Sequence, residues 1–131
     1  MKAHFILYVA DQQASGKFYK AVLGKQPELD VPGMTEFYLN DGAVLGLMPA
    51  AGIKRLIGDR LPDPMIGRII PRAEVYLLSD EPELFHRRAI ENGARELSSL
   101  LPRDWGHEAA YCLDPDGHVL AFARAGATDR S

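Results

Sequence analysis

The sequence contains one pattern twice, and this repetition constrains the fold more than any other feature. Asp11 opens a stretch that closes at Gly24, and Asp80 opens one that closes at Gly93. The offset is 69 residues for both pairs (80 − 11 and 93 − 24). An apolar run precedes each Asp, and an Asp-Gly turn followed by another apolar run comes later in each half. Two copies of one unit predict a pseudo-twofold protein with a shared cleft.

The first copy reads as one helix among four strands. Residues 4–9 form an apolar run, and Asp11 is placed to cap a helix over 12–23. The apolar residues of that segment recur at helical spacing, and Gly24 is suited to end the helix in a left-handed conformation. Further strands are expected near 28–31, 35–39 and 43–48.

The second copy predicts the same order of elements. A strand is expected over 73–79, followed by a helix that Asp80 caps and that carries Pro82 in its first turn. Asn92-Gly93 is expected to end this helix. Three strands should follow near 95–100, 108–113 and 119–123. The fold class is therefore α+β, with two βαβββ units.

The length of the chain and its linker predict the domain organisation. At 131 residues the chain is predicted to be one domain, with repeats at about 3–48 and 72–124 joined by a linker at 49–71. The linker carries many apolar residues, so we expect it to be packed, against a partner subunit or over the cleft, with a short helix near 53–57.

The charge and cysteine content limit the possible partners and the cell compartment of the protein. A net charge of −3 gives no reason to expect nucleic acid, and no apolar run approaches the ~20 residues that cross a bilayer. The single cysteine, Cys112, excludes a disulfide within the chain and suits a reducing compartment. We therefore expect a cytoplasmic protein.

The motifs resemble those of a known superfamily. Tyr-Val-Ala-Asp (8–11), Phe-Tyr-Lys-Ala-Val-Leu-Gly (18–24), Trp105-Gly106 and Asp-Pro-Asp-Gly-His (114–118) occur in this order. Together with the two βαβββ units they closely resemble the vicinal oxygen chelate superfamily, the glyoxalase, bleomycin-resistance and extradiol dioxygenase group. The resemblance covers about residues 3–124. It implies U-shaped mixed sheets around a cleft, often completed across a homodimer, and it leaves the activity open because the superfamily includes both metal enzymes and metal-free binding proteins.

In metal-using relatives the ligands come from the first and last strands of each unit. The matching positions here are His4, Gly46, Glu74 and Ala121. Glycine and alanine have no side-chain donor, so at most His4 and Glu74 remain, whereas catalytic divalent sites generally use three or more protein ligands. The resemblance therefore predicts no tightly held metal.

The orientation of Glu74 depends on a register that differs by one residue between the repeats. Counting back seven residues from Asp80 makes Ala73 the repeat mate of His4 and would bury Glu74 under a helix. Burying an unpaired carboxylate costs several kcal/mol. A one-residue shift at the helix start instead places Val75 and Leu77 under the helix, so we expect Glu74 to face the cleft.

The cleft is expected to have mostly apolar walls with a few polar groups. Trp105-Gly106 matches a pair that offers an aromatic surface to planar ligands in the bleomycin-resistance branch. Relatives often carry Arg two residues after that Gly, whereas this chain has Glu108, which implies a preference for neutral or cationic guests. The residues expected to line the cleft are His4, Ile6, Tyr8, Val44, Gly46, Met48, Glu74, Tyr76, Leu78, Trp105, His107, Glu108, Val119 and Ala121.

Each of these residues has a purely structural alternative. His4 could be a strand-edge imidazole bonded to a backbone carbonyl, and Glu74 a surface carboxylate paired with Arg72 or Lys2. Trp105 could be a packing anchor. Cys112 is expected to be a small buried residue, with a nucleophilic pairing to His107 or His118 as the alternative.

The leading hypothesis is a metal-free, homodimeric small-molecule-binding protein of the bleomycin-resistance type, which sequesters an aromatic or amphiphilic guest as antibiotic-resistance proteins do. The alternative is a divalent-metal-dependent lyase or dioxygenase in which His4 and Glu74 are surviving ligands. A third hypothesis makes His4 and Glu74 a metal-independent acid/base pair acting on a carbonyl compound.

Overall fold

The computed structural model describes residues 1–68 and 70–126, and the chain divides into two compact units, Met1–Ile69 and Ile70–Ser131. Each unit holds one four-stranded sheet, and the protein belongs to the expected α+β class. The first unit contains β1 (Ala3–Val9), α1 (Gln12–Leu23), β2 (Leu29–Val31), β3 (Met34–Asn40), β4 (Ala43–Pro49), α2 (Ala50–Ile57) and the 3₁₀ helix η1 (Gly58–Arg60). The second contains β5 (Glu74–Leu78), α3 (Pro82–Glu91), β6 (Arg95–Pro102), β7 (His107–Leu113) and β8 (Val119–Ala125).

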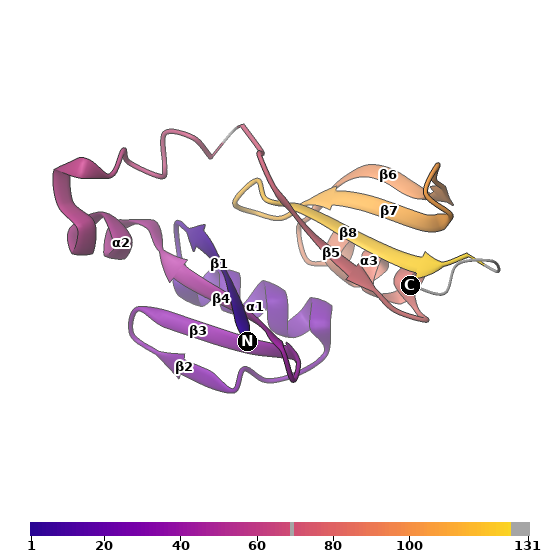
Figure 1. Cartoon of the computed structure of the whole chain (residues 1–131), viewed down its shortest axis with the longest axis horizontal. Helices are drawn as coiled ribbons and strands as arrows, with labels where there is room; N and C mark the ends of the chain where they lie inside the picture. Colours follow the sequence, from indigo (N-terminus) through magenta and orange to yellow (C-terminus); the bar gives the residue numbers. More distant parts are fainter. Residues whose placement is uncertain (69, 127–131) are drawn as a thin grey trace. The chain divides into compact units, whose positions relative to one another are not determined.

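The two sheets have the same topology. The strand order is β1-β4-β3-β2 in the first and β5-β8-β7-β6 in the second, as the ribbons of Figure 1 show for each unit. The pairs β1–β4 and β5–β8 are parallel and the other neighbours are antiparallel, so both sheets are mixed. The repeated sequence thus folds into two copies of one βαβββ unit.

The core of the first unit lies between α1 and one face of its sheet. Gln12 at the start of α1 donates through Nε2 to Thr35 Oγ1 at 2.9 Å, which identifies the face that α1 covers. Alternate strand residues share that face with Thr35. The fully buried apolar residues on it, Phe37, Leu45 and Leu47, accompany Phe18, Tyr19 and Val22 of α1.

The core of the second unit is built in the same way. Phe122 of β8 is fully buried and stacks on Phe85 of α3, with the ring centroids 6.2 Å apart, so this is the face that α3 covers. Its neighbours on that face, Ala110, Cys112 and Leu120, are also fully buried.

The helix starts differ by one residue between the repeats. Asp11 is the N-cap of α1, and its carboxylate accepts from the Ala14 N–H at 3.0 Å, as expected. The prediction that Asp80 caps α3 is wrong, because α3 begins at Pro82 and its N-cap position is Glu81. The Ser79 hydroxyl accepts from the Glu81 N–H at 3.2 Å. This bond lies in the turn before α3, so the helix starts one residue later than in the first repeat.

The segment after β4 is partly helical. The short helix expected near 53–57 is confirmed as the longer α2, which contacts β4 and β1. Leu56, Ile57, Ile66 and Ile70 are exposed on this chain. The covering partner that we expect for this segment stays a prediction, and its residue 69 lies outside the described residues. None of the helices among residues 1–68 and 70–126 has the length and apolar character needed to cross a bilayer.

Candidate functional site

The face of the second sheet that α3 leaves uncovered carries six of the candidate residues; we call it the helix-free face. Side chains alternate along a strand, so Tyr76, which pairs with Ala121, lies opposite to the Phe122 face. Glu74 lies two residues before Tyr76 and shares its face, with Val75 and Leu77 on the α3 side. This is the parity that the one-residue shift predicts. The expected residues on this face are Glu74, Tyr76, Leu78, His107, Val119 and Ala121.

Three side chains on this face form a hydrogen-bonded group, which we call the aromatic cluster: Tyr76, Trp105 and His107. The Tyr76 Oη lies 2.7 Å from His107 Nδ1, and the Trp105 Nε1–H donates to the same Oη at 3.0 Å. The ring centroid of Tyr76 is 5.8 Å from that of His107 and 6.5 Å from that of Trp105. The cluster therefore places one phenolic oxygen between two nitrogen atoms.

The indole of Trp105 is both anchored and accessible. Its N–H is bonded within the cluster, yet 54% of the residue is exposed. This combination suits an aromatic surface that receives a planar ligand, because the ring is held in place while its area is available to a guest.

A tight turn between β6 and β7 carries Trp105. The Gly106 N–H donates to the Arg103 carbonyl at 3.1 Å, and the Arg103 N–H donates to the His107 carbonyl at 2.8 Å. Gly106 has φ of 93°, a conformation that glycine adopts without strain. The glycine of the Trp-Gly pair is thus favoured by the geometry of this turn as well as being part of a sequence motif.

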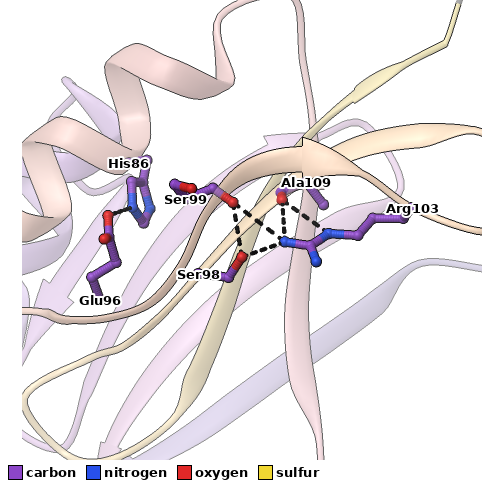
Figure 2. Close-up of polar contacts among 6 residues, drawn as sticks. All are labelled: His86, Glu96, Ser98, Ser99, Arg103 and Ala109. Carbon is purple, nitrogen blue, oxygen red and sulfur yellow. Dashed lines mark hydrogen bonds and ion pairs between the residues drawn. The ribbon is translucent and has the colours of Figure 1, made fainter.

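Arg103 fastens this turn to the sheet, as Figure 2 shows. Its guanidinium donates to the Ala109 carbonyl from Nε at 3.2 Å and from Nη2 at 2.8 Å, and Nη2 also lies 2.5 Å from Ser98 Oγ and 3.3 Å from the Ser99 carbonyl. The register of β6 against β7 shifts on both sides of Ser98, which leaves these acceptors available to the guanidinium. The Arg103 guanidinium also lies over the Tyr111 ring, 5.0 Å from its centroid. Sequence reasoning missed Arg103, because its acceptors on β6 and β7 come together only when these strands pair.

Figure 2 also shows the pair that ties α3 to β6. His86 Nε2 lies 2.8 Å from Glu96 Oε2, and the His86 ring meets the edge of Phe122 at a centroid distance of 6.2 Å. This pair belongs to the packing of α3 and stands apart from the aromatic cluster.

Glu74 acts electrostatically on this face. Burial raises the pKa of the Tyr111 hydroxyl, and the negative charge of Glu74 raises it further. Both residues therefore belong to one electrostatic environment, in which Tyr111 stays protonated and can donate a hydrogen bond at neutral pH.

Glu108 does not lie with the other candidates. It pairs with Arg124 across β7 and β8, with Glu108 Oε2 3.7 Å from the Arg124 Nη2. The same Nη2 lies 2.6 Å from Glu83 of α3, so this pair is on the α3 side of the sheet. The expectation that Glu108 lines the cleft with His107 is wrong, because adjacent strand residues point to opposite faces. The inferred preference for neutral or cationic guests therefore loses its basis.

In the first unit the candidates lie on the sheet face opposite α1. His4, Ile6, Tyr8, Val44, Gly46 and Met48 share this face by register. Within this unit His4 Nδ1 lies 3.4 Å from Glu36 Oε2, whereas Glu74, the partner considered for His4 in the sequence, belongs to the other unit. Val44 is fully buried and has no surface to offer a ligand.

Gly46 and Ala121, two of the positions that match metal ligands in relatives, have no side-chain donor here. A Cβ at Gly46 would meet Ile6 Cγ1 at 3.1 Å and Met34 Sδ at 3.3 Å, so apolar atoms crowd the position where relatives have a ligand. Ala121 is fully buried. Within residues 1–68 and 70–126, no three His, Cys, Asp or Glu side chains gather as a metal site would require.

The register decides the alternative in which Cys112 pairs with His107. Cys112 lies on the α3 side with Leu120, opposite to His107. Burial raises the pKa of its thiol to about 12, with the charges of Asp114 and Glu96 adding to the effect. A thiol of this kind is not a nucleophile at neutral pH, and the His107 pairing is excluded.

Comparison with known proteins agrees with this architecture. Residues 3–122 match the Glyoxalase/Bleomycin resistance protein/Dioxygenase superfamily. No protein of curated function matches the sequence.

Solved structures show the same fold. A glyoxalase-related enzyme from Fulvimarina pelagi is 23% identical over 95% of this chain and 87% of its own, with a TM-score of 0.75. The hypothetical protein SA1046 from S. aureus is 19% identical over 95% of this chain and 93% of its own, with a TM-score of 0.76. A glyoxalase/bleomycin resistance protein from Albidiferax ferrireducens T118 is 22% identical over 92% and 95%, with a TM-score of 0.70. With its repeated βαβββ unit and a match over residues 3–122, the chain belongs to the glyoxalase/bleomycin resistance/dioxygenase superfamily, also called the vicinal oxygen chelate superfamily.

Proposed function

We propose that this protein binds an aromatic or amphiphilic small molecule without a metal, in the manner of the bleomycin-resistance branch of its superfamily. The guest lies against the helix-free face of the second sheet, with Trp105 as its main contact surface. The observation that carries the proposal is the aromatic cluster, in which an anchored indole keeps more than half of its surface exposed.

The donor set supports the metal-free part of the proposal. Two of the four positions that match metal ligands in relatives are Gly46 and Ala121, which have no side-chain donor, and His4 at a third position is paired with Glu36. A pair of ligands holds a divalent ion weakly compared with the three or four of a catalytic site. A metal-dependent lyase or dioxygenase remains the alternative function.

Exposed apolar residues support a homodimer as part of the proposal. The edge strand β1 carries Phe5, Ile6 and Tyr8, all substantially exposed on this chain. Edge strands with large exposed apolar side chains are usually covered in the working protein.

The single buried cysteine is consistent with a cytoplasmic location.

Binding can be measured with the probe 8-anilinonaphthalene-1-sulfonate, an aromatic amphiphile whose emission rises on binding. We expect saturable binding with energy transfer from Trp105, the only tryptophan of the chain. Trp105→Ala should weaken binding about tenfold, because an aromatic contact contributes about 0.5–1.5 kcal/mol beyond its buried area. Bleomycin and other aromatic antibiotics can then be ranked by competition and by thermal shift.

Tyr38→Phe is the matched control for this experiment. Tyr38 is an exposed aromatic residue of the first unit, where its ring contacts Lys2. Its replacement should leave the affinity unchanged. Equal affinities for the wild type and Trp105→Ala would contradict the proposed site.

Elemental analysis separates the proposal from its alternative. After dialysis against Zn²⁺, Ni²⁺, Fe²⁺ or Mn²⁺ and then against buffer, we expect well under one metal ion per chain. One tightly held ion per chain, lost in a His4→Ala variant, would favour the metal-dependent lyase or dioxygenase.

A further inference from the structure

We propose that Tyr76 and His107 form an acid/base pair that moves a proton within an aromatic carbonyl compound held against Trp105. The inference rests on the proposed function, because the same face receives the guest. It adds keto–enol tautomerisation to binding.

The hydrogen bonds of the cluster allow Tyr76 Oη to act in both directions. When the phenol donates its proton to His107 Nδ1, across 2.7 Å, Oη can accept a proton from a guest. When Nδ1 carries the proton and donates to Oη, the phenolic O–H is available to donate to a guest. The Trp105 N–H donates to Oη in both states, at 3.0 Å, and holds the oxygen in place.

This exchange of roles is what tautomerisation requires, since the catalyst must first remove a proton and then return it elsewhere. A single oxygen backed by a nitrogen base can do both. Tyr76 is the catalytic residue because its Oη meets the guest. His107 acts through Tyr76 and is a positioning and proton-storing residue.

The proposed step balances without a co-reactant. A C–H bond next to the guest carbonyl breaks, and its electron pair forms the C=C bond of an enolate. The proton goes to Tyr76 Oη while the phenol's own proton goes to His107 Nδ1. The imidazolium then returns a proton to Oη, and the phenol protonates the enolate oxygen, which releases the enol and restores the starting state.

The class of substrate follows from the surroundings. Trp105 offers a flat, half-exposed ring, so the guest should carry an aromatic ring close to its carbonyl group. The carbon that loses its proton should be activated by both the ring and the carbonyl. The ketone 2-tetralone has these features and serves as the probe.

The test measures deuterium uptake by 2-tetralone at the carbon between ring and carbonyl, by proton NMR in D₂O. We expect the wild-type protein to accelerate exchange over buffer by about 100-fold, the lower range for a positioned acid/base group. Tyr76→Phe keeps the ring and removes Oη, so its exchange should fall to the buffer rate. The Kd for 2-tetralone, measured by quenching of Trp105 emission, should change less than about threefold.

Variants at His107 and in the first unit complete the design. His107→Gln should lose exchange at saturating ketone while keeping the Kd, a split that a purely structural role would not produce. Tyr38→Phe should behave as wild type. Thermal unfolding followed by Trp105 emission verifies that each variant is folded.

The outcomes separate the two proposals. Wild-type exchange at the buffer rate with 10 mM ketone, or equal exchange by wild type and Tyr76→Phe, overturns the acid/base inference. If the fluorescent probe still binds at Trp105, the proposed binding function stands. If neither probe binds, both proposals fail.

Discussion

Phe122→Ala is expected to lower the free energy of unfolding of the second unit by about 3–5 kcal/mol, the usual cost of truncating a buried phenylalanine. Phe122 is fully buried on β8, which lies between β5 and β7. Its ring stacks on Phe85 at 6.2 Å and also contacts the His86 ring at 6.2 Å. Truncation would remove contacts with α3 and leave a cavity that the rigid sheet cannot close. Urea unfolding followed by Trp105 emission measures the loss, because Trp105 reports on this unit.

Two further variants calibrate this result. Leu97→Ala, at a half-exposed position of β6, should cost no more than about 0.5 kcal/mol, as surface substitutions usually do. Phe122→Leu keeps much of the volume and should fall between the two, which preserves the comparison if Phe122→Ala does not fold. A Phe122→Ala cost equal to that of Leu97→Ala would contradict the assignment of Phe122 to the core.

Cys112 is expected to react with iodoacetamide at pH 8 at least about a thousandfold more slowly in the folded protein than in urea. The thiolate is the reactive form, and burial raises the pKa of this thiol from 9.0 to about 12. At pH 8 the folded protein therefore holds about a thousandfold less thiolate than the unfolded chain. Mass spectrometry of the alkylated protein over time measures the rate. The urea concentration at which reactivity rises should coincide with the unfolding of the second unit.

The same shift predicts an alkaline limit to stability. Because the folded pKa is raised, the thiol favours the folded state at pH values below 9, and this contribution is lost as the pH rises from 9 toward 12. Cys112→Ala should lose part of this pH dependence. A native thiol that reacts as fast as the unfolded one would show that Cys112 is accessible.

The elements of the fold were predictable because they depend on local sequence. The apolar period and the Asp11 cap predict α1 with its observed bounds, and the Asp-Gly turns separate the strands of each sheet. The orientation of Glu74 was also predictable, because burying its carboxylate under a helix would be costly. This orientation goes together with a shift in the helix, because α3 begins one residue later than the repeat implies.

The partners within the site were less predictable. Glu36 reaches His4 because a register irregularity between Tyr38 and Asn40 shifts β3 by one residue against β4. Counting from the Asn40–Ala43 pair without this shift would place Phe37 opposite Gly46 and turn Glu36 to the other face. A one-residue shift in one strand thus decides whether Glu36 meets His4.

Sequence by itself determined the repeated βαβββ units, the family and the absence of side-chain donors at positions 46 and 121, because these depend on residue identity and on spacing along the chain. Only the tertiary structure decided that Tyr76, Trp105 and His107 share one phenolic oxygen, that Arg103 fastens their turn, and that Glu108 lies on the opposite face. The physical reason is that such contacts depend on strand register and turn geometry, which irregularities in pairing change without any mark in the local pattern.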